Sequence, residues 1–183
     1  MTLLLRLSRA IDLVTAFFGR SIAWMILAAV LVSAGNAVIR KLFDMSSNGW
    51  LELQWYLFGA VFMLGAAYTL QRNEHIRIDI VSGLFTERTR QWIDVVGHLF
   101  FLLPLTFVMT WEMLPWVRRA IVSGEMSGNA GGLILWPARL CLLVGFVLLL
   151  FQGISELIKT VARLRGLLAD STEAHSAARI LVE

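Results

Sequence analysis

Four long apolar stretches dominate the sequence and constrain the fold more than any other feature. They cover about residues 21–40, 51–71, 92–117 and 133–158. About 20 apolar residues in a helix are enough to cross the hydrocarbon core of a bilayer. Lipid offers no partners for unpaired backbone groups, and the stretches are continuously apolar rather than alternating, so helices are expected and barrel strands are excluded. The sequence therefore predicts an all-α membrane protein with four transmembrane helices.

The composition agrees with this class and limits what else the chain can contain. Hydrophobic residues make up 58% of the 183 residues and charged residues only 16%, whereas a soluble domain is about 45–50% apolar and about 25% charged. The connections between the apolar stretches are too short to form a soluble domain that could hold an active site. The single cysteine, Cys141, lies in an apolar stretch, so no disulfide within the chain is expected.

The basic residues lie at the ends of the apolar stretches, so they predict orientation rather than nucleic-acid binding. One side of the membrane would carry those of the N-terminal segment, the second connection and the tail, which are Arg6, Arg9, Arg20, Arg72, Arg77, Arg88, Arg90, Lys159, Arg163, Arg165 and Arg179. The other side would carry only Arg40, Lys41, Arg118 and Arg119, with Arg139 near the start of the fourth helix. Because basic residues are enriched in cytoplasmic connections, we expect both termini and the middle connection in the cytoplasm.

Two segments flank the predicted membrane domain, residues 21–158, and are expected on the cytoplasmic side. In the first, residues 1–20, apolar side chains recur about once per helical turn while charged side chains occupy the other face. Such a segment either lies in the interface or extends the first helix inward. Within the membrane domain, residues 76–85 of the second connection resemble another short interfacial helical segment. The tail, residues 159–183, becomes polar and alanine-rich, and we expect its end to be frayed.

Tryptophans mark the predicted helix ends on the non-cytoplasmic side. An indole ring is favoured in the headgroup region because its body is apolar and its N–H can reach water. The expected interface anchors are Trp50, Trp111, Trp116 and Trp136, and Trp55 lies in the same zone.

Glycine, alanine and proline predict local backbone behaviour at three places. Pro104 lies in the middle of the third span, where proline removes a backbone hydrogen bond and is expected to kink the helix. The connection 123–132 holds four glycines and is expected to be a flexible external loop. The second helix carries small residues that we expect to pack closely against neighbouring helices. They are Gly59, Gly65, Ala66 and Ala67.

Charged side chains within the apolar stretches are costly in lipid, so they are candidate functional residues. Glu52, near the start of the second helix, either pairs with Arg40, Lys41 or a partner subunit, or reaches water at the interface. Arg139 is the deepest basic residue. It either extends outward to the headgroups or pairs with one of two acids, Glu112 or Glu125.

Histidine and acid side chains do not form a recognisable catalytic or cofactor site. Asp94 and His98 are four residues apart and share a helix face, so they predict either a proton relay or a hydrogen bond within a bundle. Haem would need ligands on facing helices, and only His98 lies within a span. We therefore expect no catalytic residue, metal site or cofactor in this chain.

The stretch that begins at Trp50, WLELQWYLFGAVFMLGAAYTLQRNEHIRIDIV, closely resembles the hallmark of DctQ-type small permease subunits of TRAP (tripartite ATP-independent periplasmic) transporters. That hallmark is a glutamate near the start of helix two, an aromatic-rich apolar helix, and then a His-[VI]-Arg-[VI]-Asp run. The matching positions are Glu52, His75, Arg77 and Asp79, and Arg40 resembles the basic residue that closes the family's first helix. The resemblance covers about residues 10–160.

A second segment, SGEMSGNAGGLILWPARLCLLVGFVLLLFQGISELIK, resembles the mannitol or chloroaromatic branch of this family. In that branch a GGLPLWP-like element leads into helix four, and Ile134 stands where the element often has proline. The branch resemblance points to a monocarboxylate substrate such as a 2-oxo acid, lactate or an aromatic acid.

The resemblance implies a role as part of a larger assembly in the bacterial inner membrane. In such transporters a periplasmic substrate-binding protein delivers an organic acid to a large permease subunit, which holds the substrate and sodium sites and moves in elevator fashion. The small subunit is a static scaffold beside it, so the expected partners are the large subunit, the binding protein and membrane lipids. The residues expected to hold this scaffold or its interface together are Arg40, Glu52, Trp55, His75, Arg77, Asp79 and Arg139.

Two other functions remain open at this point. If the chain is not a scaffold, it is either a self-contained small transporter or the membrane anchor of an electron-transfer complex. The sequence shows no internal repeat and no interrupted pair of helices, which are features of carriers, and this favours the scaffold.

Overall fold

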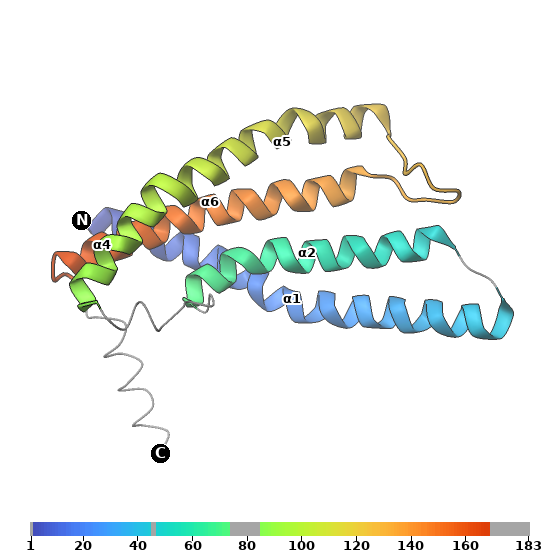
Figure 1. Ribbon diagram of the computed structural model, residues 1–183, viewed down its shortest axis with the longest axis horizontal. Coiled ribbons are helices and arrows are strands. Elements are labelled where there is room, and N and C mark those ends of the chain that lie inside the picture. The colour runs from blue at the N-terminus through green and yellow to red at the C-terminus, as the bar shows by residue number, and fades with distance from the viewer. Residues whose placement is uncertain (1, 45–46, 74–84, 169–183) are drawn as a thin grey trace, which may run out of the picture.

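The computed structural model describes residues 2–44, 47–73 and 85–168, and long helices account for most of them (Figure 1). The elements are α1 (Thr2–Phe43), α2 (Asn48–Arg72), α4 (Glu87–Gly97), the π-helical turn η1 (His98–Leu102), α5 (Leu103–Ser123) and α6 (Trp136–Leu164). Because α4, η1 and α5 are continuous, four helices are long and apolar enough to cross a membrane. The predicted all-α membrane fold is confirmed.

The first helix is continuous across the expected boundary at residue 20. It contains 42 residues and is therefore roughly 60 Å long, about twice the thickness of the hydrocarbon core. Of the two arrangements considered for residues 1–20, the described residues adopt the one that extends the first helix. In Figure 1 this N-terminal part of α1 crosses behind the end of α6, and the rest of α1 runs beside α2.

Helix ends are set by residues that favour them. Asp44, after α1, and Asn73, at the C-cap of α2, have φ values of 52° and 55°, a left-handed conformation that Asp and Asn tolerate better than most residues. At the start of α4 the side chain of Thr86 accepts a hydrogen bond from the backbone N–H of Thr89. Pro137 lies in the first turn of α6, where its missing N–H costs little.

A π-helical turn precedes Pro104 in the third span. Proline cannot donate a backbone hydrogen bond, and in an ordinary helix its ring would meet the carbonyl of the residue four positions earlier, Phe100. The turn His98–Leu102 contains that carbonyl, and π-turns are a common way to accommodate an irregularity within a helix. The sequence predicted a kink at Pro104, and the structure places this widened turn there.

Close packing occurs between α2 and α6. A Cβ atom added at Gly145 of α6 would lie only 2.6 Å from the Cβ of Met63 and 3.0 Å from its carbonyl oxygen. Among the small residues singled out on α2, Ala67 is fully buried, whereas Gly59 has no neighbour within 4 Å of a Cβ built on it. Small residues therefore permit close packing around α2, but Gly59 does not take part in it.

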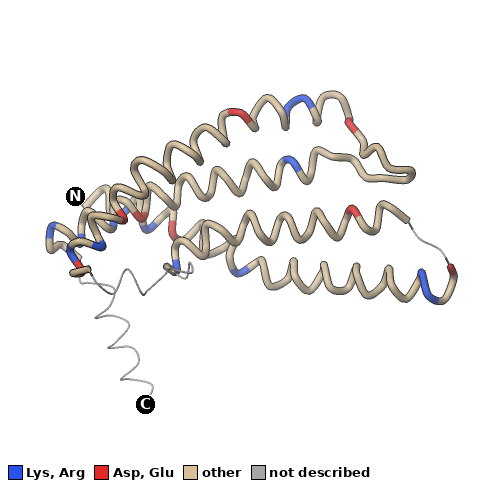
Figure 2. Tube along the Cα trace, viewed as in Figure 1, with Lys and Arg blue, Asp and Glu red and all other residues tan. Residues whose placement is uncertain are grey.

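Large apolar side chains cover the outside of the helices. Trp24, Phe62 and Phe101 are between 73% and 75% exposed. Charged residues lie mainly toward the two ends of the bundle (Figure 2). This distribution suits a lipid environment, in which apolar side chains need not be buried against one another.

Candidate functional site

Glu52 lies in the second turn of α2 and is only 4% exposed. One carboxylate oxygen accepts hydrogen bonds from the hydroxyl of Ser127 and from the side-chain amide of Asn129, the latter at 2.8 Å. The other oxygen accepts a hydrogen bond of 2.6 Å from the backbone N–H of Leu133. A buried carboxylate is tolerated when donors replace its water. We call Glu52, Ser127, Asn129 and Leu133 the Glu52 clamp.

Glu52 is buried, as the first of the two predicted arrangements has it, but its partners within the described residues are not Arg40 or Lys41. They belong to the connection between α5 and α6. Pairing of Glu52 with a partner subunit stays a prediction. The clamp therefore joins the start of α2 to a loop that is about 80 residues further along the chain.

The clamped loop has its own hydrogen bonds. The backbone N–H of Ser127 donates to the carbonyl of Leu133 at 2.9 Å, and Leu135 donates to Glu125 at 2.9 Å, on either side of a bridge between residues 126 and 134. Gly131 has a φ of 72°, and a Cβ at Gly132 would lie 2.6 Å from that of Ser127. The glycines therefore allow the loop to form a compact turn, and their role is not limited to flexibility.

Arg139 fastens the start of α6 to the same end of the bundle. Its guanidinium lies 2.7 Å from the carboxylate of Glu125 and 4.4 Å from the centre of the Trp116 ring. Its side chain is 13% exposed. Of the two acids considered as partners, the structure therefore pairs Arg139 with Glu125, and a cation–π contact on α5 adds to the pair.

A second polar cluster lies at the opposite end, between α1 and α6. Its members on α1 are Ser8, Asp12 and Thr15, spaced four and three residues apart, and those on α6 are Gln152, Ser155, Glu156 and Lys159, which also share one face. We call these seven residues the Asp12 network. It brings together residues about 140 positions apart.

Charged groups lie at the centre of the Asp12 network. The ammonium of Lys159 is 3.1 Å from the carboxylate of Asp12 and 2.5 Å from that of Glu156. The side-chain amide of Gln152 donates to both carboxylates at 2.9 Å. Since two acids share one ammonium, both carboxylates depend on the neutral donors as well as on the lysine.

Neutral side chains complete the Asp12 network. The carbonyl of Gln152 accepts a hydrogen bond of 2.8 Å from Thr15, and the hydroxyl of Ser155 donates to Asp12 at 2.9 Å and lies 2.7 Å from that of Ser8. Gln152 and Ser155 are fully buried. From α2, the amide of Gln71 donates to the backbone carbonyl of Asp12 at 2.9 Å. With this contact from Gln71, the Asp12 network joins three helices.

The other sequence-predicted residues that the structure describes do not enter either cluster. Arg40 is exposed in the last turn of α1, and Trp55 is 64% exposed on α2. Of the expected anchors, Trp50 and Trp111 are exposed, while Trp116 and Trp136 are half-buried. His75, Arg77 and Asp79, with most of the segment 76–85, lie outside the described residues.

Asp94 and His98 interact through the main chain. Nδ1 of His98 lies 2.6 Å from the backbone carbonyl oxygen of Asp94. This hydrogen bond holds the imidazole against its own helix at the start of the π-turn. Within the described residues no group of three or more His, Cys, Asp and Glu side chains is placed to hold a metal ion.

Sequence reasoning missed most of both clusters. Ser127 and Asn129 carried no signal beyond a glycine-rich loop. Gln152, Ser155, Glu156 and Lys159 do form a recognisable polar stripe at the end of the most apolar helix, because their spacing repeats the helical period. That stripe, together with the polar face of residues 1–20, was the sequence signal that could have indicated the Asp12 network.

One comparison with known proteins identifies the family. The model of the family described as "Tripartite ATP-independent periplasmic transporters, DctQ component" matches residues 29–163. No curated protein and no solved structure matches the chain. The matched region contains the whole Glu52 clamp and the α6 side of the Asp12 network. Because the match covers well over half of a chain with four membrane-spanning helices, this protein belongs to the DctQ family and is the small membrane subunit of a TRAP transporter.

Proposed function

We propose that the chain is the static scaffold of a sodium-coupled, binding-protein-dependent transporter for organic acids, and that it supports a large elevator-type permease subunit. Membership of the DctQ family gives the place in a tripartite transporter. The observation that carries the scaffold role is that buried polar groups fasten the helices to one another at both ends of the bundle.

The two fastenings oppose sliding of the helices. The Glu52 clamp and Arg139 join α2, α5 and α6 at one end, and the Asp12 network joins α1, α2 and α6 at the other. A shift of one helical turn, about 5.4 Å, would break several of these hydrogen bonds together. Each buried group left without a partner costs about 1–3 kcal/mol. A carrier needs two arrangements of similar energy, whereas this bundle favours one.

The basic residues support an orientation for this scaffold. Both termini and the Asp12 network would face the cytoplasm of a bacterial inner membrane, and the clamped loop would face the periplasm. The substrate-binding protein would then approach the side on which Glu52 fixes the loop. The wide apolar surface of α1 and α5 would contact lipid and the large subunit.

A disulfide between α1 and α6 tests whether the scaffold moves. The hydroxyl oxygens of Ser8 and Ser155 are 2.7 Å apart, so cysteines at these positions are within reach of a disulfide. The variant Ser8→Cys/Ser155→Cys, in a Cys141→Ser background, would be assembled with the large subunit and the binding protein in proteoliposomes. We expect the rate of sodium-driven uptake of the organic acid to be the same before and after oxidation.

The controls separate the scaffold role from its alternatives. Ser8→Cys alone should not respond to oxidation, and the small subunit alone should carry no flux of a 2-oxo acid, lactate or an aromatic acid. Uptake that disappears on oxidation of the double-cysteine variant and returns with reductant would show that α1 and α6 move during transport. Flux through the small subunit alone would also rule out the scaffold.

A further inference from the structure

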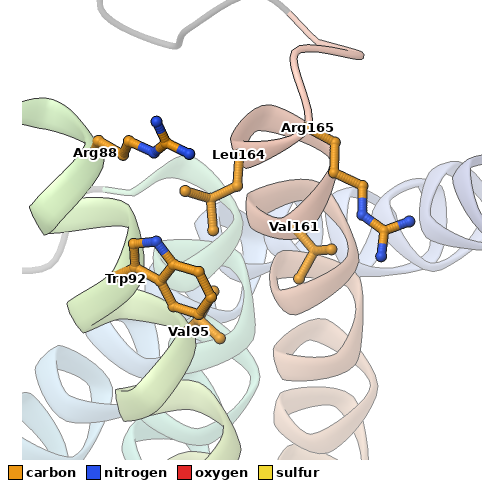
Figure 3. A pocket seen from close by; sticks show the side chains of 6 residues that line it. All are labelled: Arg88, Trp92, Val95, Val161, Leu164 and Arg165. Carbon is orange, nitrogen blue, oxygen red and sulfur yellow. The ribbon is translucent and has the colours of Figure 1, made fainter.

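A groove of about 210 Å³ lies between the beginning of α4 and the end of α6 (Figure 3). It belongs to neither of the polar clusters described above. Its lining is mainly apolar, with a basic residue contributed by each helix. The described residues that line it are Arg88, Trp92 and Val95 of α4, and Val161, Leu164 and Arg165 at the end of α6.

The groove is polar at one end and apolar at the other. Arg88 is in the first turn of α4, and Val95 lies seven residues further along, or about 10 Å deeper. Arg165 follows the last residue of α6, and Val161 lies one turn deeper. Both helices thus place arginine at their ends and valine one or two turns further along, toward the middle of the bundle. Figure 3 shows Arg88 reaching from α4 toward Leu164, with Arg165 on the far side of Leu164.

Positive charge predominates around the polar end. Arg90 and Arg163 lie in the same terminal turns as the two arginines of the groove, and the acidic residue in the first turn of α4 is Glu87. Figure 2 shows basic residues gathered where α4 begins and α6 ends. Both Arg88 and Arg165 are exposed, so their guanidinium groups are accessible to a ligand.

We propose that this groove binds one anionic glycerophospholipid. Arg88 would contact the phosphate, Arg165 would add positive charge from the other side of Leu164, and part of an acyl chain would lie over Trp92, Val95 and Val161. Clusters of basic residues at a membrane surface attract anionic headgroups, and an apolar lining favours the removal of hydrocarbon from water.

Other occupants fit the groove less well. A soluble anion would leave its apolar lining uncovered, and an uncharged amphiphile would leave the arginines without a counter-charge. A partner helix without acidic side chains would likewise leave the arginines without a counter-charge. An amphipathic anion matches both the apolar lining and the basic residues.

Native mass spectrometry of the full chain in detergent tests the lipid site with dioleoyl phosphatidylglycerol as the probe. We expect Arg88→Ala/Arg165→Ala to weaken binding about thirtyfold, since each basic residue near an anionic lipid contributes about a fivefold gain in affinity. Arg118→Ala/Arg119→Ala removes the same charge from exposed positions on α5 and should bind like the wild type. Dioleoyl phosphatidylcholine should bind weakly to all three proteins.

A second variant tests whether lipid binding depends on the apolar part of the groove and not only on the positive charge of the arginines. Val161→Trp fills the apolar part but keeps both arginines, and it should also lose phosphatidylglycerol binding while eluting as a single peak with a wild-type melting temperature. If that variant does not fold, Val95→Phe blocks the groove from α4 instead.

Three results would overturn the lipid site. The first is equal phosphatidylglycerol binding by the wild type and the arginine variant. The second is displacement of the lipid by millimolar glycerol phosphate, which would indicate an anion site. The third is lower recovery of the large subunit with the arginine variant at unchanged lipid binding, which would make this surface a protein contact.

Discussion

At the scale of single residues, Glu52 is the best-defined contact on the clamped side of the protein. Its carboxylate accepts three hydrogen bonds from one loop, and two of the donors are side chains of Ser127 and Asn129. Alanine at this position would leave these donors facing a buried space. Glutamine would retain one acceptor oxygen but would put an NH₂ group against a donor.

We expect Glu52→Ala to lower the melting temperature of the purified subunit more than Glu52→Gln does. Loss of a buried carboxylate with three donors should cost about 2–4 kcal/mol, since several donors lose their partner at once. Glu112→Ala is the matched control because Glu112 is an exposed glutamate on α5. Equal melting temperatures for Glu52→Ala and Glu112→Ala would contradict the clamp.

In the Asp12 network, Lys159 is the charged residue that contacts both carboxylates, as Glu52 contacts all the donors of its clamp. We expect Lys159→Met to destabilise the subunit by about 2–4 kcal/mol because one buried carboxylate, Glu156, and one half-buried carboxylate, Asp12, lose their counter-charge. Adding Glu156→Gln should restore part of that loss, because one of the two negative charges is then removed. Thermal unfolding of both variants would check this, and a double variant less stable than Lys159→Met would show that the two acids do not compete for the lysine.

Sequence patterns could identify only some of these residues as important. Glu52 stood out because a charge near lipid is rare, and the position of Arg139 indicated the acid Glu125 as one of two partners. Lys159 was interpreted only as a topology signal. Its role depends on Asp12, which lies 147 positions earlier, and no local pattern connects residues so far apart.

At the scale of elements, the closest approach between α2 and α6 depends on Gly145. An added methyl group there meets the side chain and the carbonyl of Met63, so the two helices would have to separate. The substitution would not destabilise the helical conformation of α6 itself, because alanine favours a helix more than glycine does.

We therefore expect Gly145→Ala to lower the melting temperature and Gly59→Ala to leave it unchanged or raise it. The two substitutions are chemically the same, and Gly59 has open space around its Cα. The difference in unfolding free energy should be about 1–3 kcal/mol, the usual cost of overpacking. Stabilisation by Gly145→Ala would mean that α2 and α6 are less tightly packed than the contacts indicate.

At the scale of the whole molecule, the bundle has two distinct ends. One has the Glu52 clamp and the loop 123–132, and the other has the Asp12 network and the groove between α4 and α6. The arrangement of basic residues predicts that the end with the Asp12 network faces the cytoplasm and the other end the periplasm.

Labelling of single cysteines in cells tests this orientation. In a Cys141→Ser background, Gly128→Cys in the loop should react with a membrane-impermeant maleimide in cells whose outer membrane is open to the reagent. Arg165→Cys should react only after the inner membrane is permeabilised. Both positions are exposed, so burial does not explain a difference. The reverse pattern of labelling would place the termini outside the cytoplasm.

The sequence by itself determined that the chain forms four membrane-spanning helices, because hydropathy and stretch length act locally and continuously apolar stretches of this length span lipid as helices. It also determined family membership, through residues close together in the second helix and the segment after it. Only the tertiary structure decided which polar faces meet. The partners of Glu52 and of Asp12 lie on distant helices, and their pairing follows from how the helices cross and pack, which no single stretch of sequence encodes.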